Sequence, residues 1–237
     1  MTRLRAGLFF VWFFLISIPL ALAYLALQLL PRQAMMGGIR FWARLTIAGL
    51  RVILGIRVEF RGLEHLPRGR ALVAAKHQSM FDFIGPFVFL PDGCFVLKKE
   101  LLRIPVFGWH AMKSRMIPID RQGHSRALKD LVRDARERLS EDRQIVIFPE
   151  GTRALPGAPP DYKPGVAALY RELGLACTPM ATNSGAHWPA RGFPSRPGVI
   201  VFEVLPAIPP GLKRAEFMRE LQARIETAST ALLEAGL

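Results

Sequence analysis

Hydrophobic positions divide the chain into an apolar N-terminal segment and a longer region of alternating short patterns. Residues 7–30 carry no charged side chain, and this run exceeds the roughly 20 residues that a helix needs to cross a bilayer. Pro19 lies near its middle and is expected to kink the helix. Residues 34–57 form a second apolar stretch that also contains arginines. The pattern therefore predicts two membrane-associated helices before residue 58.

Three arginines of the second stretch fall on one side of a helix. At about 100° per residue, Arg40, Arg44 and Arg51 lie within a stripe of roughly 40°. Apolar side chains such as Phe41 and Ile53 point in other directions. A narrow cationic stripe is typical of an amphipathic helix at a lipid headgroup surface. A helix that packs on the protein with a solvated arginine face would show the same pattern.

A secretory signal peptide is the alternative for the first residues. Arg3 and Arg5 precede an apolar run, and residues 21–23 (ALA) resemble a cleavage site. The apolar run continues through residues 24–30, beyond the usual core of about 7–15 residues, which favours a retained anchor. A single span and a hairpin that enters one leaflet both stay open. Arginines are more numerous after this run than before it, which predicts an inner-membrane protein with its domain on the cytoplasmic side.

Beyond residue 57, short apolar runs alternate with helical patterns. The predicted strands span residues 57–60, 71–76, 94–98, 115–119, 144–148, 176–181 and 198–204. The predicted helices span residues 80–90, 123–140, 165–173 and 213–234. Because the strands are continuous apolar runs, they fit a sheet covered on both faces. We expect an α/β fold with a mixed, largely parallel sheet flanked by helices, with an anchor of residues 1–57 and a domain of residues 58–237.

Composition narrows the classes of function. The chain has 237 residues, of which 51% are hydrophobic, so it is not intrinsically disordered. Two cysteines are too few for a disulfide scaffold, and the five histidines show no paired ligand spacing, so no metal site is expected. A net charge of +13 points to an anionic partner. The chain has no aromatic-interleaved basic stretch, so we expect membrane phospholipids and a phosphorylated substrate rather than nucleic acid.

The run KHQSMFD, residues 76–82, joins a predicted strand to a predicted helix. His77 and Asp82 would lie about 140° apart within one helix, but a turn at His77 lets Asp82 reach back from the first helical turn. A carboxylate on one ring nitrogen fixes the histidine tautomer and raises the basicity of the other nitrogen. Such a pair suits general-base activation of a substrate hydroxyl. Ser79 and Asp82 also match a helix-capping pattern, so both interpretations stay open locally.

Two further polar segments follow predicted strands. FPEGTR, residues 148–153, comes at a strand end, where open α/β sheets place their binding sites. Glu150 is suited to accept hydrogen bonds from glycerol hydroxyls, and Arg153 to bind a phosphate through two donors. RMIPIDR, residues 115–121, places Arg121 just beyond another strand. An ordinary loop with Gly151 at a turn is the alternative for the first segment.

Four segments together resemble the motif blocks of the glycerolipid acyltransferases. They are HQSMFD, RMIPIDR, FPEGTR and CTPM, in this order. HX4D alone is a weak pattern, whereas HX4D followed by IDR and then FPEGTR is specific. The resemblance extends from about residue 58 to about residue 205. Pro118 stands where the family usually has an aromatic or aliphatic residue, which bears on the choice of acceptor.

The resemblance implies transfer of a fatty acyl group from acyl-CoA or acyl carrier protein to the sn-2 hydroxyl of lysophosphatidic acid, giving phosphatidic acid in phospholipid synthesis. His77 would remove the hydroxyl proton, and Asp82 would orient His77. The implied substrate-binding residues are Lys98, Arg121, Glu150, Gly151, Thr152 and Arg153. Among them, Lys98, Arg121 and Arg153 are assigned to the acceptor phosphate and Glu150 to the glycerol part. No cofactor and no metal are implied.

Two alternatives remain at this point. A related acyltransferase would use another acceptor, such as a lyso-ornithine lipid, a lysophospholipid or glycerol 3-phosphate. A non-catalytic lipid-binding membrane protein on the same fold has no need of a base. The presence of His77, Asp82 and Glu150 argues against that second alternative.

Overall fold

A seven-stranded sheet forms the centre of the structure, a computed structural model that describes residues 2–120, 123–192 and 196–236. Its strands are β1 (Ile56–Arg61), β2 (Ala71–Ala75), β3 (Gly93–Lys98), β4 (Ile117–Ile119), β5 (Gln144–Ile147), β6 (Cys177–Thr182) and β7 (Gly198–Val204). They lie in the order β1-β7-β6-β2-β5-β3-β4. β6 and β7 pair antiparallel, and the other neighbours pair in parallel. The mixed, largely parallel sheet predicted from the sequence is thereby confirmed.

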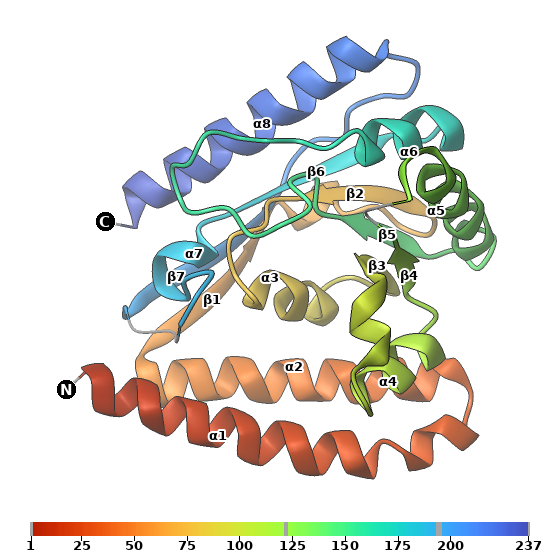
Figure 1. Ribbon diagram of the computed structural model, residues 1–237. Helices are drawn as coiled ribbons and strands as arrows, with labels where there is room; N and C mark the ends of the chain where they lie inside the picture. Colours follow the sequence, from red (N-terminus) through yellow and green to blue (C-terminus); the bar gives the residue numbers. More distant parts are fainter. Residues whose placement is uncertain (1, 121–122, 193–195, 237) are drawn as a thin grey trace.

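Helices cover both faces of the sheet (Figure 1). One face carries α5 (His124–Leu139), α6 (Gly165–Leu173) and α8 (Arg214–Ala235), and the other carries α1 (Thr2–Ala23), α2 (Arg32–Leu54) and α3 (Phe81–Ile84). Side chains of β2 alternate between these layers. Leu72 and Ala74 pack towards α5, α6 and α8, whereas Val73 and Ala75 pack towards α1, α2 and α3. Burial on both faces explains why this strand is apolar without interruption.

Three helical segments differ from the sequence prediction. The helix predicted over 80–90 is broken, because α3 ends at Ile84 and a 3-10 helix follows over Gly85–Val88. Pro86 has no N–H to continue the α-helical ladder, which accounts for the break. Two short helices were not predicted, α4 (Phe107–Lys113) and α7 (Ser184–His187). Both are too short for their periodicity to stand out in the sequence.

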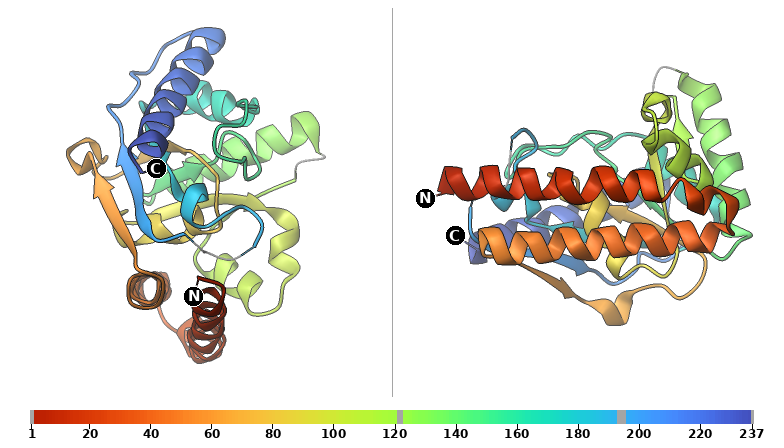
Figure 2. Two further views of the ribbon diagram at one scale, coloured as in Figure 1. Left: turned by 90° about the vertical axis from the view of Figure 1, so that its left-hand side faces the viewer. Right: turned by 90° about the horizontal axis from the view of Figure 1, so that it is seen from below.

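The two N-terminal helices lie side by side beneath the sheet and run in opposite directions (Figures 1 and 2). A 3-10 turn over Ala26–Leu29 joins α1 to α2. Trp42 Nε1 of α2 donates to Ser17 Oγ of α1 at 2.8 Å, and a Cβ at Gly49 would collide with the Trp12 ring. In the part of the chain that is described, the stretch Arg3–Leu29 is long and apolar enough to cross a membrane, by length and composition alone.

An ion-pair cluster fastens the start of α2 to the sheet. The guanidinium of Arg32 donates to both oxygens of Asp92, at 2.8 and 2.7 Å, and the buried Arg143 approaches Asp92 at 3.3 Å. Burial alone would raise the pKa of Asp92, but the hydrogen bond from Arg32 and the charge of Arg143 outweigh it and lower that pKa. At its other end, a single residue, Gly55, connects α2 directly to β1 of the sheet. The helix is therefore held at both ends.

Replacing Arg32→Gln should lower the unfolding temperature, because Asp92 loses its two-donor partner. The lost charged hydrogen bonds are worth about 2 kcal/mol, which corresponds to a decrease in Tm of about 4–8 °C. The lowered pKa of Asp92 means that this stabilisation is present above about pH 4 and fades as the pH falls towards the pKa in the folded state. Differential scanning fluorimetry of detergent-purified protein measures the effect.

Arg133→Gln is the matched control. Arg133 lies exposed on α5 and pairs with Asp130 and Asp134 at the surface, where ion pairs contribute little. An equal decrease in Tm for both variants would contradict a special role for the Arg32 cluster.

Candidate active site

The turn between β2 and α3 brings His77 and Asp82 together. β2 ends at Ala75 and α3 begins at Phe81, so His77 lies in the turn and Asp82 in the first helical turn. Nδ1 of His77 is 3.1 Å from Oδ2 of Asp82. The Asp82 side chain is 1% exposed and the His77 side chain 16% exposed. The imidazole is thus accessible while its carboxylate partner is enclosed.

Both oxygens of Asp82 accept hydrogen bonds. Oδ2 accepts the backbone N–H groups of Gln78, at 2.5 Å, and Ser79, at 2.7 Å, and Oδ1 accepts the hydroxyl of Ser184. One carboxylate therefore contacts both the backbone of the turn before α3 and the imidazole of His77. An ionised carboxylate only accepts hydrogen bonds, so it assigns the ring proton of His77 to Nδ1 and leaves Nε2 as the basic nitrogen.

The FPEGTR segment after β5 holds His77 from a second side. Phe148 stacks on the imidazole with ring centroids 4.0 Å apart. The N–H of His77 donates to Oε2 of Glu150 at 2.9 Å, and the carbonyl of His77 accepts the N–H of Ala154 at 2.8 Å. These contacts arise because β2 and β5 are parallel neighbours whose carboxyl ends meet at one edge of the sheet. The ring and both main-chain polar groups of His77 are consequently fixed.

Glu150 is placed by an ion pair beneath this turn. Its side chain is 3% exposed, and its Oε1 lies 2.7 Å from Nζ of Lys76. Burial raises the pKa of Glu150, while Lys76 and the N–H of His77 act in the opposite direction. The sequence predicts that Glu150 binds acceptor hydroxyls, and in the structure its carboxylate contacts Lys76 and the N–H of His77. In this arrangement one oxygen of Glu150 holds the main chain of His77 and the other binds Lys76.

Those remaining predicted binding residues that the structure describes lie at or after strand ends on the same edge of the sheet. Gly151 has a φ of 66°, a left-handed conformation that glycine adopts without strain, and it turns the chain into the exposed Thr152 and Arg153. Lys98 ends β3 and is exposed. β3 lies two strands from β2, or roughly 10 Å at the usual strand spacing. Arg121 lies outside the described residues.

Sequence reasoning missed Lys76 and Ser184. Ser184 follows β6, which neighbours β2 in the sheet, and no local pattern in the sequence reveals that neighbour. Lys76 did carry a signal, since a lysine at the end of an otherwise apolar strand needs a partner when it is buried. The free cysteines Cys94 and Cys177 are buried, as predicted for core residues, and burial raises the pKa of the Cys94 thiol to about 11. Within the described ranges, no cluster of three His, Cys, Asp or Glu side chains is placed to hold a metal ion.

The chain is similar in sequence to known proteins. Residues 57–183 match the sequence model of the family described as Acyltransferase. The chain is 37% identical to the 1-acyl-sn-glycerol-3-phosphate acyltransferase of Pseudomonas aeruginosa, over 78% of this chain and 72% of that protein. A Helicobacter pylori protein of the same name is 29% identical, over 67% of this chain and 68% of that one.

A solved structure shares the fold. The crystal structure of the 1-acyl-sn-glycerophosphate (LPA) acyltransferase PlsC from Thermotoga maritima aligns with a TM-score of 0.81 and 21% sequence identity. The alignment covers 98% of each chain. Because an alignment of this extent includes α1 and α2, the N-terminal helix pair is part of the shared fold.

Proposed function

Because the chain belongs to the acyltransferase family, we propose that it transfers a fatty acyl group from a thioester to the sn-2 hydroxyl of lysophosphatidic acid, giving phosphatidic acid. The names of its relatives support this acceptor. The observation that carries the proposal is the pairing of His77 Nδ1 with the buried Asp82 at 3.1 Å. A lipid-binding protein without catalysis has no use for such a base.

In the proposed reaction, Nε2 of His77 takes the proton of the sn-2 hydroxyl while the oxygen attacks the thioester carbonyl. The tetrahedral intermediate then collapses, the C–S bond breaks, and the leaving thiolate takes the proton from His77. Asp82 stabilises the imidazolium that forms between these steps. A thioester is already activated and releases a stable thiolate, so the proposal includes neither a cofactor nor a metal. Acyl-CoA and acyl carrier protein are both suitable donors.

Direct transfer between the two substrates fits the surroundings of His77. The Ser184 hydroxyl donates a hydrogen bond to Asp82. The hydroxyl oxygen of Ser79 accepts a hydrogen bond from the N–H of Phe81 at 3.1 Å. Cys94 and Cys177 are buried in the core, with raised thiol pKa values. The two serine hydroxyls are engaged in hydrogen bonds and the two thiols are enclosed in the core, so none of them is placed as a nucleophile. This favours a base that acts on the acceptor over a covalent acyl-enzyme.

The acceptor phosphate is assigned to cations at the carboxyl edge of the sheet. Arg153 directly precedes Ala154, whose N–H binds the His77 carbonyl, so it lies close to the reacting hydroxyl. Lys98 and Arg121 complete the proposed phosphate site, and Gly151 and Thr152 shape the loop that carries Arg153. The guanidinium of Arg153 offers the two-donor geometry that phosphate prefers.

Membrane association is proposed from the outer face of α1. Six apolar side chains are more than half exposed on this helix and recur every three or four residues: Leu4, Leu8, Val11, Leu15, Ile18 and Leu22. Such a one-sided stripe fits lipid contact. On α2, the neighbouring Arg44 and Arg51 are exposed and suit the headgroup phosphates.

The packing of α1 favours a hairpin in one leaflet over a crossing span. Near its start, Phe9 packs edge-on against Trp188 of the domain, with ring centroids 5.5 Å apart. Near its end, Nε2 of His110 on α4 is 2.8 Å from the Ala21 carbonyl oxygen. Both ends of α1 therefore lie on the domain (Figure 2). We propose that residues 1–57 lie in the cytoplasmic leaflet of the inner membrane and hold the domain of residues 58–237 at its surface.

His77→Ala should abolish acyl transfer. Loss of a general base lowers kcat by about 10²–10⁴-fold, whereas His65→Ala should leave it unchanged because His65 lies in an exposed turn. The assay offers labelled acyl-CoA or acyl carrier protein to lysophosphatidic acid, glycerol 3-phosphate, a lyso-ornithine lipid and lysophosphatidylcholine. Phosphatidic acid is the expected His77-dependent product. A different main product would assign another acceptor to the enzyme. Undiminished transfer by His77→Ala would refute the mechanism.

Arg153→Met should raise the KM for lysophosphatidic acid. A lost charged hydrogen bond to phosphate is worth about 1.5–3 kcal/mol, or roughly a 10–100-fold change. The KM for the phosphate-free lyso-ornithine lipid and for the acyl donor should stay within about twofold. Arg68→Met is the control, since Arg68 is exposed and precedes the amino end of β2. Equal effects on both acceptors would contradict the phosphate assignment.

Replacing Leu8 and Leu15 together by glutamate should weaken binding to phosphatidylglycerol vesicles. Each leucine that loses lipid contact costs about 1.5–3 kcal/mol, so co-sedimentation should decrease more than tenfold. Leu63→Glu is the control, because Leu63 is also exposed but lies between β1 and β2. Unchanged sedimentation of the double variant would exclude this face of α1 from the membrane contact.

A further inference from the structure

A buried charge network joins the C-terminal helix α8 to the segment that carries His77. Nζ of Lys76 lies 2.7 Å from Oε1 of Glu150 and 2.8 Å from both carboxylate oxygens of Glu226. The hydroxyl of Tyr162 donates to Oε1 of Glu226 at 2.8 Å. The Lys76 side chain is 2% exposed. An ammonium group enclosed to this degree depends on the carboxylates that surround it.

Lys76 reaches α8 because of the alternation along β2. Ala74 faces the layer of α5, α6 and α8, and Ala75 faces the layer of α3. The N–H of Lys76 continues the pairing with β6 by donating to the Met180 carbonyl at 2.9 Å. Lys76 therefore projects towards α8, while the next residue, His77, projects to the opposite side against Phe148. The charge network lies directly behind the proposed base.

A continuous series of contacts runs from α8 to the main chain of His77. Glu226 binds Lys76, Lys76 binds Glu150, and Oε2 of Glu150 accepts the N–H of His77 at 2.9 Å. Glu150 has one oxygen for each neighbour, so a shift of Lys76 displaces the oxygen that holds His77. Each step is a charged hydrogen bond in a largely enclosed site, where such contacts are strong.

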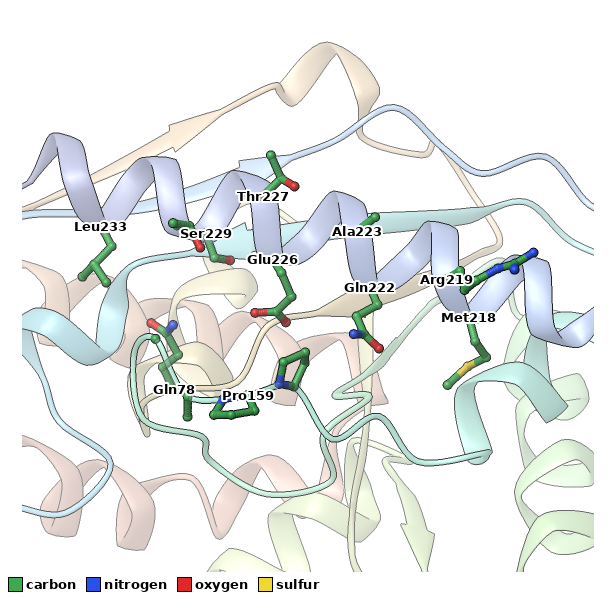
Figure 3. Close-up of a pocket in the computed structure, with 14 residues that line it drawn as sticks. Gln78, Pro159, Met218, Arg219, Gln222, Ala223, Glu226, Thr227, Ser229 and Leu233 are labelled. Carbon is green, nitrogen blue, oxygen red and sulfur yellow. The ribbon is translucent and has the colours of Figure 1, made fainter.

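Glu226 is the most solvent-exposed side chain of this series. It projects from α8 towards the loop that carries Pro159 and towards Gln78, and it lines a cavity of about 530 Å³ between them (Figure 3). Its side chain is 24% exposed. Removing its charge therefore leaves Glu150 as the remaining carboxylate partner of Lys76.

We infer that Glu226, on a helix outside the matched family segment of residues 57–183, is a positioning residue that holds His77 in place through Lys76 and Glu150. The inference rests on the proposed function for its effect on rate. The mechanical link from α8 to His77 stands on the contacts alone. Because Asp82 and Phe148 hold the imidazole independently, loss of Glu226 should displace His77 without unfolding the turn.

The first test measures the mechanical link without any reaction. Hydrogen exchange is followed by mass spectrometry in full-length detergent-purified wild type and Glu226→Gln, which keeps the shape and removes the charge. Peptides containing residues 76–82 should exchange on the order of tenfold faster in the variant, because the His77 N–H loses a fixed acceptor. Glu220→Gln is the control, since Glu220 lies on the same helix and pairs with Arg224. Unchanged exchange at 76–82 overturns the inference.

The second test measures kinetics. Glu226→Gln should lower kcat about tenfold, because small misplacements of a reacting group are costly, and KM for the acceptor and the donor should stay within about twofold. A merely structural role would lower the amount of active enzyme and Tm while leaving the kcat of the folded fraction unchanged. That result, or an unchanged kcat beside faster exchange, would overturn the positioning role.

A double-mutant cycle identifies Lys76 as the intermediary. If Glu226 acts through Lys76, the loss of kcat in the double variant Lys76→Met/Glu226→Gln should be at least about threefold smaller than the product of the two single losses. Multiplicative losses would show that Glu226 acts by another route. If wild type shows no His77-dependent transfer at all, the proposed function fails, and the exchange experiment still decides whether α8 holds His77.

Discussion

The Asp82 carboxylate determines how the β2–α3 turn is built and what that turn can do. One of its oxygens accepts the backbone N–H groups of Gln78 and Ser79, in the turn before α3, and lies within hydrogen-bond distance of Nδ1 of His77. The other binds the hydroxyl of Ser184 at the end of β6. The same carboxylate therefore holds the turn between β2 and α3, links it to the segment after β6 and contacts the imidazole. A change at Asp82 affects the local fold and the base together, so loss of activity there cannot be assigned to one of them alone.

The end of β2 sends consecutive side chains towards the two helical layers on opposite faces of the sheet. His77 stacks on Phe148, on the side of the sheet that carries α3. The N-terminal helices lie beneath α3 on that side (Figure 1), and Phe9 and Phe13 of α1 contact Trp188 there. Lys76 faces the opposite side and joins Glu150 to Glu226 of α8. The imidazole that would take the acceptor proton and the charge network that we infer to position it therefore lie on opposite sides of the sheet. Alternation along a single strand separates these two tasks.

Local patterns in the sequence carried the predictions that succeeded. Each predicted strand overlaps an observed one, because continuous apolar runs mark strands covered on both faces. The proximity of His77 and Asp82 was predictable because five residues across a strand–helix turn form a local unit. Ser184 and Glu226 were not predictable in this way. They lie 102 residues from Asp82 and 150 residues from Lys76, and their positions depend on the order of strands in the sheet and on the placement of α8.

In the proposed mechanism, His77 acts as a base on the acceptor, and the acyl group passes directly from donor to acceptor. The most direct measurement mixes wild-type enzyme with acyl-CoA, and separately with acyl carrier protein, in the absence of acceptor. The reaction is quenched in acid within milliseconds to minutes, and the intact mass of the protein is recorded. If transfer is direct, the protein stays unmodified at every time, and transfer begins when lysophosphatidic acid is added. A protein species heavier by one acyl group, formed and then consumed by the acceptor at the rate of turnover, would contradict direct transfer.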